Sequence, residues 1–98
     1  MIIVTGSLVA RDGWLAEALV LSLEHVRRSR AESGCLSHAV HQDAENPSRL
    51  VFLEEWVDQA ALATHFSVPA SRSFARAIAA MAVEPPMLKV FEVTGSGV

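Results

Sequence analysis

The chain has 98 residues, a net charge of −3 at pH 7 and a composition that is 51% hydrophobic. This length suits one compact domain and leaves no room for a second core, while the apolar content argues against intrinsic disorder. We therefore expect a single domain over residues 1–98. The basic cluster Arg27, Arg28 and Arg30 has no aromatic residues interleaved, so we interpret it as a solvated helix end and expect no nucleic-acid partner.

The number of cysteines and the distribution of apolar residues indicate in which cellular compartment the protein is expected. Cys35 is the single cysteine, so no internal disulfide can form and an oxidising compartment is not required. The first ten residues lack the basic segment of a signal peptide, and no apolar run approaches the roughly 18 residues of a membrane span. We expect a soluble cytoplasmic protein without a membrane partner.

The N-terminal third of the chain predicts a strand and a long helix. Residues 1–10 are rich in β-branched side chains and predict a strand that the turn at Asp12 and Gly13 closes. Residues 14–32 contain Ala, Leu, Glu and Arg without Gly or Pro, which favours a helix. Gly34 is expected to form the C-terminal cap of that helix.

A hairpin follows. Residues 35–42 predict a second strand, and residues 50–57 predict a third. The turn formers of residues 43–48 lie between them, so the two strands are expected to be antiparallel neighbours.

The C-terminal part predicts a helical segment and a last strand. Asp58 can cap a second helix, which Pro69 interrupts and which resumes over residues 71–82. Residues 87–94 predict a strand, and residues 95–98 a frayed tail.

The predicted order β-α-β-β-α-β is that of the ferredoxin-like α+β fold, a four-stranded antiparallel sheet with both helices on one face. The third strand is apolar on both faces, because Leu50 and Phe52 point one way while Val51 and Leu53 point the other. The helices can cover only one of these faces. We therefore predict a homodimer packed sheet to sheet, a dimeric α/β-barrel.

Four segments stand in a characteristic order along the chain: ESGCL at residues 32–36, DAENP at 43–47, EEWVD at 54–58, and AL at 61–62 followed by His65. Together they resemble the antibiotic-biosynthesis monooxygenase family, including its quinol-monooxygenase branch. The resemblance implies a ferredoxin-like domain that dimerises through its sheet. It also implies oxygenation of anthrones or quinols without metal, flavin or haem, although the family includes haem degraders, quorum-signal-processing proteins and members of no established activity.

The resemblance allows haem degradation to be tested against the sequence. Relatives that degrade haem have an Asn late in the first strand, a Trp in the second helix and an axial His further on. The corresponding positions fall near Gly6, His65 and Ala75, none of which carries the required residue. Haem is therefore rejected as a substrate.

The end of the third strand carries the candidate site. Glu54 and Trp56 share a strand face with Phe52, where a carboxylate is costly to bury unless it is paired or reaches water. Trp56 is either a core aromatic or a wall and N–H donor for a flat ligand. His65 follows in the second helix, and it is either a packing residue or a general base.

The remaining histidines receive different interpretations. His38 is expected to line the pocket, where the family often has Tyr, while His41 lies three residues on, faces the opposite side and is solvated. His25 is assigned to the surface beside Arg27 and Arg28. The sequence has no H-x-x-x-H or H-E-x-x-H spacing, so we expect no metal site and no cofactor.

These observations leave two functions open. The first is a cofactor-independent monooxygenase that oxidises a small quinol or polycyclic phenol with O₂, with His65 as base and Trp56 as donor. The second is a non-catalytic dimeric binding or stress-response protein in which both residues only pack. In the first case the residues assigned to the small aromatic substrate are Glu54, His38, Phe52 and Phe74.

Overall fold

The computed structural model describes residues 1–95, and each predicted strand and helix is present with small shifts at its ends. The elements are β1 (Ile2–Val9), α1 (Leu15–Ser29), β2 (Cys35–Gln42), β3 (Arg49–Trp56), α2 (Gln59–Ser67), α3 (Pro69–Ala80) and β4 (Met87–Glu92). Of the tail predicted over residues 95–98, all but Gly95 lies outside the described residues.

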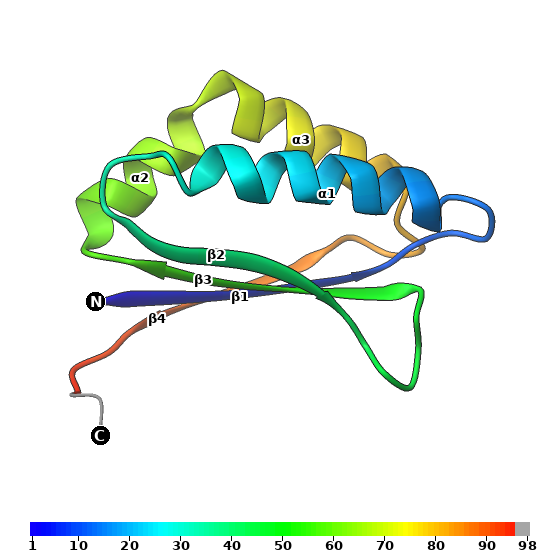
Figure 1. Cartoon of the computed structure of the whole chain (residues 1–98), viewed down its shortest axis with the longest axis horizontal. Helices are drawn as coiled ribbons and strands as arrows, with labels where there is room; N and C mark the ends of the chain where they lie inside the picture. Colours follow the sequence, from blue (N-terminus) through cyan, green and yellow to red (C-terminus); the bar gives the residue numbers. More distant parts are fainter. Residues whose placement is uncertain (96–98) are drawn as a thin grey trace.

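The four strands form one antiparallel sheet in the order β2-β3-β1-β4. Its centre is the pair β1 and β3, which are in register from Ile2 opposite Trp56 to Val9 opposite Arg49. The helices of residues 1–95 all lie over one face of this sheet, and the other face is bare (Figure 1). This arrangement confirms the predicted ferredoxin-like fold.

The turn between α1 and β2 differs from the prediction. The helix ends at Ser29 with Arg30 as its cap, so the assignment of Gly34 as the cap was wrong. Gly34 instead has a φ of +83°, and a Cβ atom there would lie 2.6 Å from Ala61 Cβ. Glycine is needed at this position because the chain turns left-handed directly against α2.

The second helical segment is two helices. The carboxylate of Asp58 accepts a hydrogen bond from the Ala61 N–H at 2.8 Å, which confirms the predicted cap of α2. Pro69 is the first residue of α3, where a missing N–H costs nothing and the fixed φ favours helix initiation. The chain changes direction at Val68, and α2 and α3 can therefore pack over different parts of the sheet.

The core lies between the sheet and the helices. On β3 the side chains of Leu50, Phe52, Glu54 and Trp56 alternate inward and are all buried. Burial of the apolar members stabilises the fold by about 1.5–3 kcal/mol each. Glu54 is the charged member of this inward row, so its environment requires a chemical explanation.

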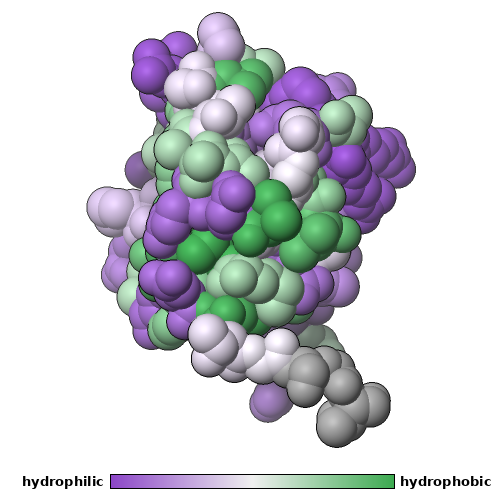
Figure 2. Space-filling view, turned by 90° about the vertical axis from the view of Figure 1, so that its left-hand side faces the viewer, coloured by the Kyte–Doolittle hydropathy of each residue, from purple (hydrophilic) through white to green (hydrophobic). Residues whose placement is uncertain are grey.

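The sheet face opposite the helices carries exposed apolar side chains and is uncovered in the single chain. Leu53 on β3 is 44% exposed and Phe91 on β4 is 48% exposed, and they pair across the sheet with Thr5 and Ile3 of β1. Figure 2 shows further apolar side chains gathered over the end of the molecule that lies on the left in Figure 1. No helix within residues 1–95 has the length and apolar character needed to cross a bilayer.

Candidate active site

A cavity of about 340 Å³ lies between the sheet and the helices. Its walls are mainly apolar and include Phe52 from β3, Phe74 and Ile78 from α3, and Leu88 from β4. A volume of this size falls in the range of small-molecule sites and accommodates a few fused rings. The polar side chains at one end of the lining include His25, Glu54 and His65.

Glu54 is an ionised carboxylate at the polar end of the cavity. Its Oε1 accepts a hydrogen bond from the indole N–H of Trp56 at 2.9 Å and lies 3.3 Å from His38 Nε2, which is long for a hydrogen bond. Burial is the largest influence on the pKa of Glu54 and raises it, but the contacts with His38 and Trp56 outweigh burial and hold the pKa below its ordinary value. The pocket therefore contains a fixed negative charge.

His65 presents one free ring nitrogen beside this carboxylate. Its Nδ1 lies 2.9 Å from Glu32 Oε1, and because a carboxylate only accepts, the Nδ1 carries the proton. In the neutral ring the Nε2 then has its lone pair available, at 4.0 Å from Glu54 Oε1. The indole of Trp56 packs on the ring with centroids 4.6 Å apart. A histidine oriented by a carboxylate in this way has the arrangement of a general base.

His25 is buried, with 5% of its surface exposed, so its assignment to the surface was wrong. It lies on the inward face of α1 and stacks on Phe74 with centroids 4.1 Å apart and an interplanar angle of 6°. Its Nδ1 accepts a hydrogen bond from the Arg28 guanidinium at 3.0 Å. Burial, reinforced by the neighbouring His38, His65 and Arg28, lowers the pKa of His25 to about 3.

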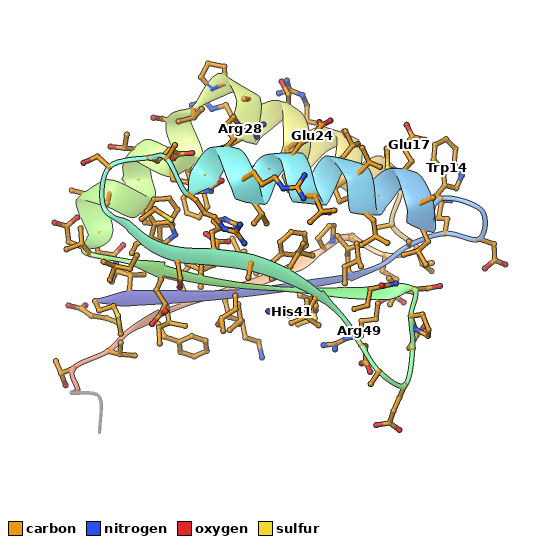
Figure 3. The ribbon with its side chains drawn as sticks, viewed as in Figure 1. Trp14, Glu17, Glu24, Arg28, His41 and Arg49 are labelled. Carbon is orange, nitrogen blue, oxygen red and sulfur yellow. The ribbon has the colours of Figure 1, made fainter. Side chains whose placement is uncertain are left out.

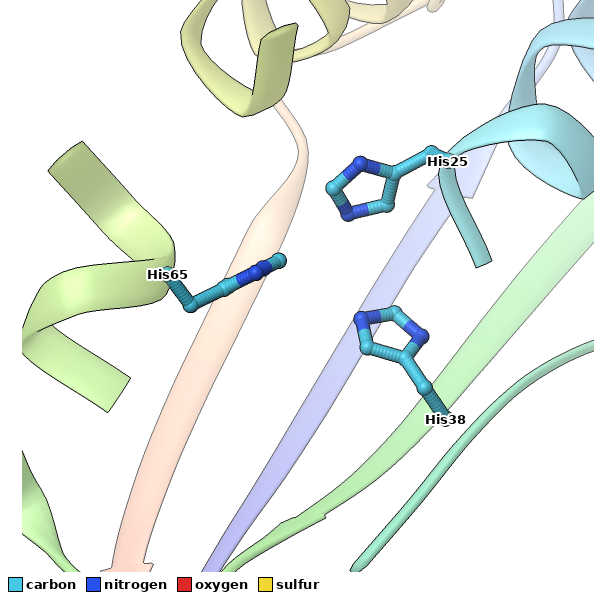
Figure 4. Close-up of side chains that lie close together, drawn as sticks. All are labelled: His25, His38 and His65. Carbon is cyan, nitrogen blue, oxygen red and sulfur yellow. The ribbon is translucent and has the colours of Figure 1, made fainter. Parts of the chain in front are cut away.

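The three histidines His25, His38 and His65 meet in space, and we call them the three-histidine cluster (Figure 4). One ring nitrogen of each lies within 4.8 Å of the others. The missing H-x-x-x-H and H-E-x-x-H spacings gave no sign of this approach, because α1, β2 and α2 bring together three histidines that are far apart in the sequence.

The donor chemistry of the cluster argues against a preformed metal site. Nitrogens bound tetrahedrally to zinc at about 2.0–2.1 Å lie about 3.3 Å apart, so the rings would have to close up. Arg28 donates to His25 Nδ1, and the proton of the neutral His25 ring is thereby on Nε2. A metal would have to displace that proton or the arginine. The cluster thus offers fewer free lone pairs than three imidazoles suggest.

The predicted site residues occupy two layers. Glu54, His65, Phe52 and Phe74 line the cavity, whereas Trp56 and His38 lie fully buried and are not among its lining residues. The indole N–H of Trp56 is engaged by Glu54, so Trp56 can act on a substrate only through that carboxylate. The catalytic and binding roles of these residues remain predictions.

His41 is exposed and lies on the side of the sheet away from the helices, as predicted (Figure 3). Sequence reasoning missed three contributors: Glu32, His25 and Arg28. Glu32 opens the ESGCL segment, which was the available signal for it. His25 had no such signal, because the buried face of α1 mixes Ser22 and Ser29 with Ala18 and Val26 and is not a continuous apolar stripe.

Comparison with known proteins identifies relatives of this chain by sequence and by fold. The family model described as antibiotic biosynthesis monooxygenase matches residues 1–77. The uncharacterized protein sll1783 of Synechocystis sp. is 27% identical over 92 residues, covering 94% of this chain. The match spans 63% of that relative's length.

Solved structures agree closely in fold. A protein from Deinococcus radiodurans, proposed to be an antibiotic biosynthesis monooxygenase, superposes with a TM-score of 0.94 at 24% identity, covering 100% of this chain and 97% of the other. Rv0793 of Mycobacterium tuberculosis gives a TM-score of 0.91 at 20% identity, covering 99% and 98%. At these identities the likeness establishes the shared architecture.

Proposed function

The chain belongs to the antibiotic biosynthesis monooxygenase family, and on that premise we propose that it oxidises a small quinol or polycyclic phenol with O₂ without a bound cofactor. Membership of the family supports a monooxygenase-type activity; the substrate class and the assignment to the quinol-monooxygenase branch are part of the proposal. We propose further that residues 1–98 act as a single domain.

The observation that carries the proposal is the Glu32–His65 pair at the polar end of an apolar cavity. Phenols react with O₂ once they are deprotonated, because the phenolate gives up an electron far more readily than the phenol. A base with a free lone pair beside a mainly apolar cavity meets that requirement. The cavity walls of Phe52 and Phe74 suit the rings of such a substrate.

The proposed reaction begins with proton transfer from the phenolic hydroxyl to His65 Nε2. The imidazolium that forms lies between Glu32 at 2.9 Å and Glu54 at 4.0 Å, so both carboxylates stabilise it. The phenolate passes one electron to O₂, and the resulting radicals combine at a ring carbon that carries hydrogen. Loss of that hydrogen with cleavage of the O–O bond leaves one oxygen on the ring as a quinone carbonyl, and the other departs as water. The substrate supplies all four electrons.

The bare sheet face supports the proposal of a homodimer. Leu53 and Phe91 are large apolar side chains about half exposed on one flat surface, and they lie on different strands of the same sheet. A second copy of the same chain covers such a face by symmetry. Association through this face leaves the cavity, on the other side of β3, free for a substrate.

The proposed function is tested by O₂ consumption with a reduced quinone or dithranol, measured against blanks with boiled protein and with no protein. We expect His65→Ala to lower turnover by roughly 10² to 10⁴, the range typical of losing a general base. Glu32→Gln should lower turnover less, because the base remains but is poorly oriented. Arg27→Met, at an exposed position on α1 that does not line the cavity, is the control and should leave turnover unchanged.

The contrary results are specific. Turnover by the His65→Ala variant at the wild-type rate, together with a lowered melting temperature, would make His65 a packing residue. No O₂ consumption by the wild-type protein above the blanks with any quinol or anthrone would favour the non-catalytic binding protein.

A further inference from the structure

We infer that His25 is a hydrogen-bond donor to the substrate's phenolic oxygen, held in the required tautomer by Arg28, and that it works opposite the base His65 on the same oxygen atom. The inference rests on the proposed function and deepens it. It assigns a catalytic role to His25 and defines the substrate as a hydroxyaromatic whose free hydroxyl enters the polar end of the cavity.

The tautomer follows from hydrogen-bond chemistry. A guanidinium can only donate, so the 3.0 Å contact from Arg28 Nη2 makes His25 Nδ1 an acceptor. The neutral ring must then carry its proton on Nε2. Arg28 stands one helical turn after His25 on α1, which favours this pairing in the folded helix.

His65 has the opposite tautomer. Glu32 can only accept, so His65 Nδ1 carries the proton and Nε2 is the acceptor. Two rings that line one cavity therefore carry opposite polarity at Nε2, an N–H donor on His25 and a lone pair on His65. Their ring centroids are 5.3 Å apart.

The spacing suits a single oxygen atom. The clustered ring nitrogens of His25 and His65 lie within 4.8 Å of each other. A closer pair gives a smaller angle; at the 4.8 Å limit, an oxygen at hydrogen-bond distance, about 2.9 Å, from both nitrogens lies at the apex of an angle of about 110°. This is close to the angle at which a hydroxyl oxygen donates one hydrogen bond and accepts another. After proton transfer, the same oxygen is a phenolate that keeps the bond from His25.

The surroundings keep His25 a neutral donor. It stacks face to face on Phe74 and is nearly fully buried, and the groups that face it are His38, His65, Arg28 and Glu54. Burial is the largest influence on its pKa, and the neighbouring rings and Arg28 lower it further; Glu54 opposes them and does not prevail. A donor that is in place before charge develops stabilises an oxyanion without reorganisation.

The third ring of the cluster does not compete for this role. His38 is fully buried, is not among the residues that line the cavity, and has its Nε2 3.3 Å from Glu54. His25 and His65 both line the cavity.

A methyl ether in place of the hydroxyl has no proton to give His65, so the arrangement selects free phenols over their ethers.

The test uses binding of 4-nitrophenol, because its phenolate has a distinct visible absorbance. The measurement is made in the absence of O₂, since it requires no turnover. We expect the wild-type protein to lower the pKa of the bound probe relative to the free probe. His25→Phe keeps the stacking on Phe74 and removes the donor, and it should raise the bound probe's pKa by about one unit, a tenfold change in its ionisation constant.

Arg28 is a positioning residue, and its variants provide a second readout. Arg28→Met should raise the bound probe's pKa in the same direction, while Arg28→Lys, which can still donate to Nδ1, should restore much of the wild-type value. Arg27→Met is the matched control, because Arg27 is the adjacent exposed cation on α1. The Arg28 variants keep the inference testable if His25→Phe does not fold.

The outcomes separate this inference from the proposed function. A lowered probe pKa that depends on His25 and Arg28, in a protein that consumes no O₂, supports the donor site and contradicts the monooxygenase. Quinol turnover with a probe pKa that is the same in the wild type, His25→Phe and Arg28→Met overturns the donor site alone. Failure of the wild type to bind the probe at millimolar concentration also overturns it.

Discussion

Replacing His25 with phenylalanine should make the protein's stability less sensitive to acid. The folded pKa of His25 is lowered from 6.5 to about 3, chiefly by burial, so the unfolded chain binds a proton there at pH values where the folded protein does not. The neutral His25 therefore makes its full contribution to the free energy of unfolding above pH 6.5, and this contribution is lost as the pH falls toward 3. A pH of 5 lies 1.5 units below the unfolded pKa of 6.5, and each unit lowers the free energy of unfolding by about 1.4 kcal/mol, so the loss at pH 5 is about 2 kcal/mol.

The measurement is urea unfolding of the wild type and His25→Phe at pH 7, 6 and 5. The variant loses the hydrogen bond from Arg28 at every pH, which lowers its free energy of unfolding by a constant amount. The test is therefore how the difference in unfolding free energy between the two proteins changes with pH. That difference should move by about 2 kcal/mol in favour of the variant between pH 7 and pH 5. Arg27→Met, at an exposed position on α1, should follow the pH dependence of the wild type. Parallel loss of stability by the wild type and His25→Phe would refute the assignment of a buried, neutral His25.

Three further predictions concern the turn, the cluster and the sheet. Gly34→Ala should destabilise the fold by about 1–3 kcal/mol in thermal melting, and by more than Gly13→Ala. Both glycines have positive φ, but only at position 34 would a Cβ lie 2.6 Å from Ala61 Cβ. Equal destabilisation by the two variants would show that this contact relaxes freely. EDTA should leave the melting temperature unchanged within about 1 °C, because Arg28 leaves the three-histidine cluster short of a lone pair, whereas a fall of several degrees would identify a bound metal. Light scattering should report twice the chain mass for the wild type and the single-chain mass for Leu53→Asp, which places a charge in the proposed interface; a monomeric wild type at micromolar concentration would contradict the homodimer.

Local pattern was sufficient to predict the elements of this protein. β-branched runs, a Gly- and Pro-free helical segment and turn formers act over a few residues, so the order of strands and helices followed from the sequence. That order leaves few topologies, and the ferredoxin-like sheet is the one observed. The doubly apolar third strand also predicted a bare face, which Leu53 shows. The cap at Gly34 was mistaken because helix ends depend on the turn that follows, and here that turn packs on α2.

The site was only partly predictable. Glu54 was identified because a carboxylate on an inward strand face is unusual. His65 was identified because it lies in a segment that resembles the family. The partners of these residues are set by packing: Glu32 meets His65 across 33 residues of chain, and His25 turns inward because of how α1 rotates against the sheet. The sequence by itself therefore determined the fold and two of the polar groups in the cavity. The three-dimensional structure decided which tautomers His25 and His65 adopt, because each tautomer depends on whether the neighbouring side chain donates or accepts a hydrogen bond.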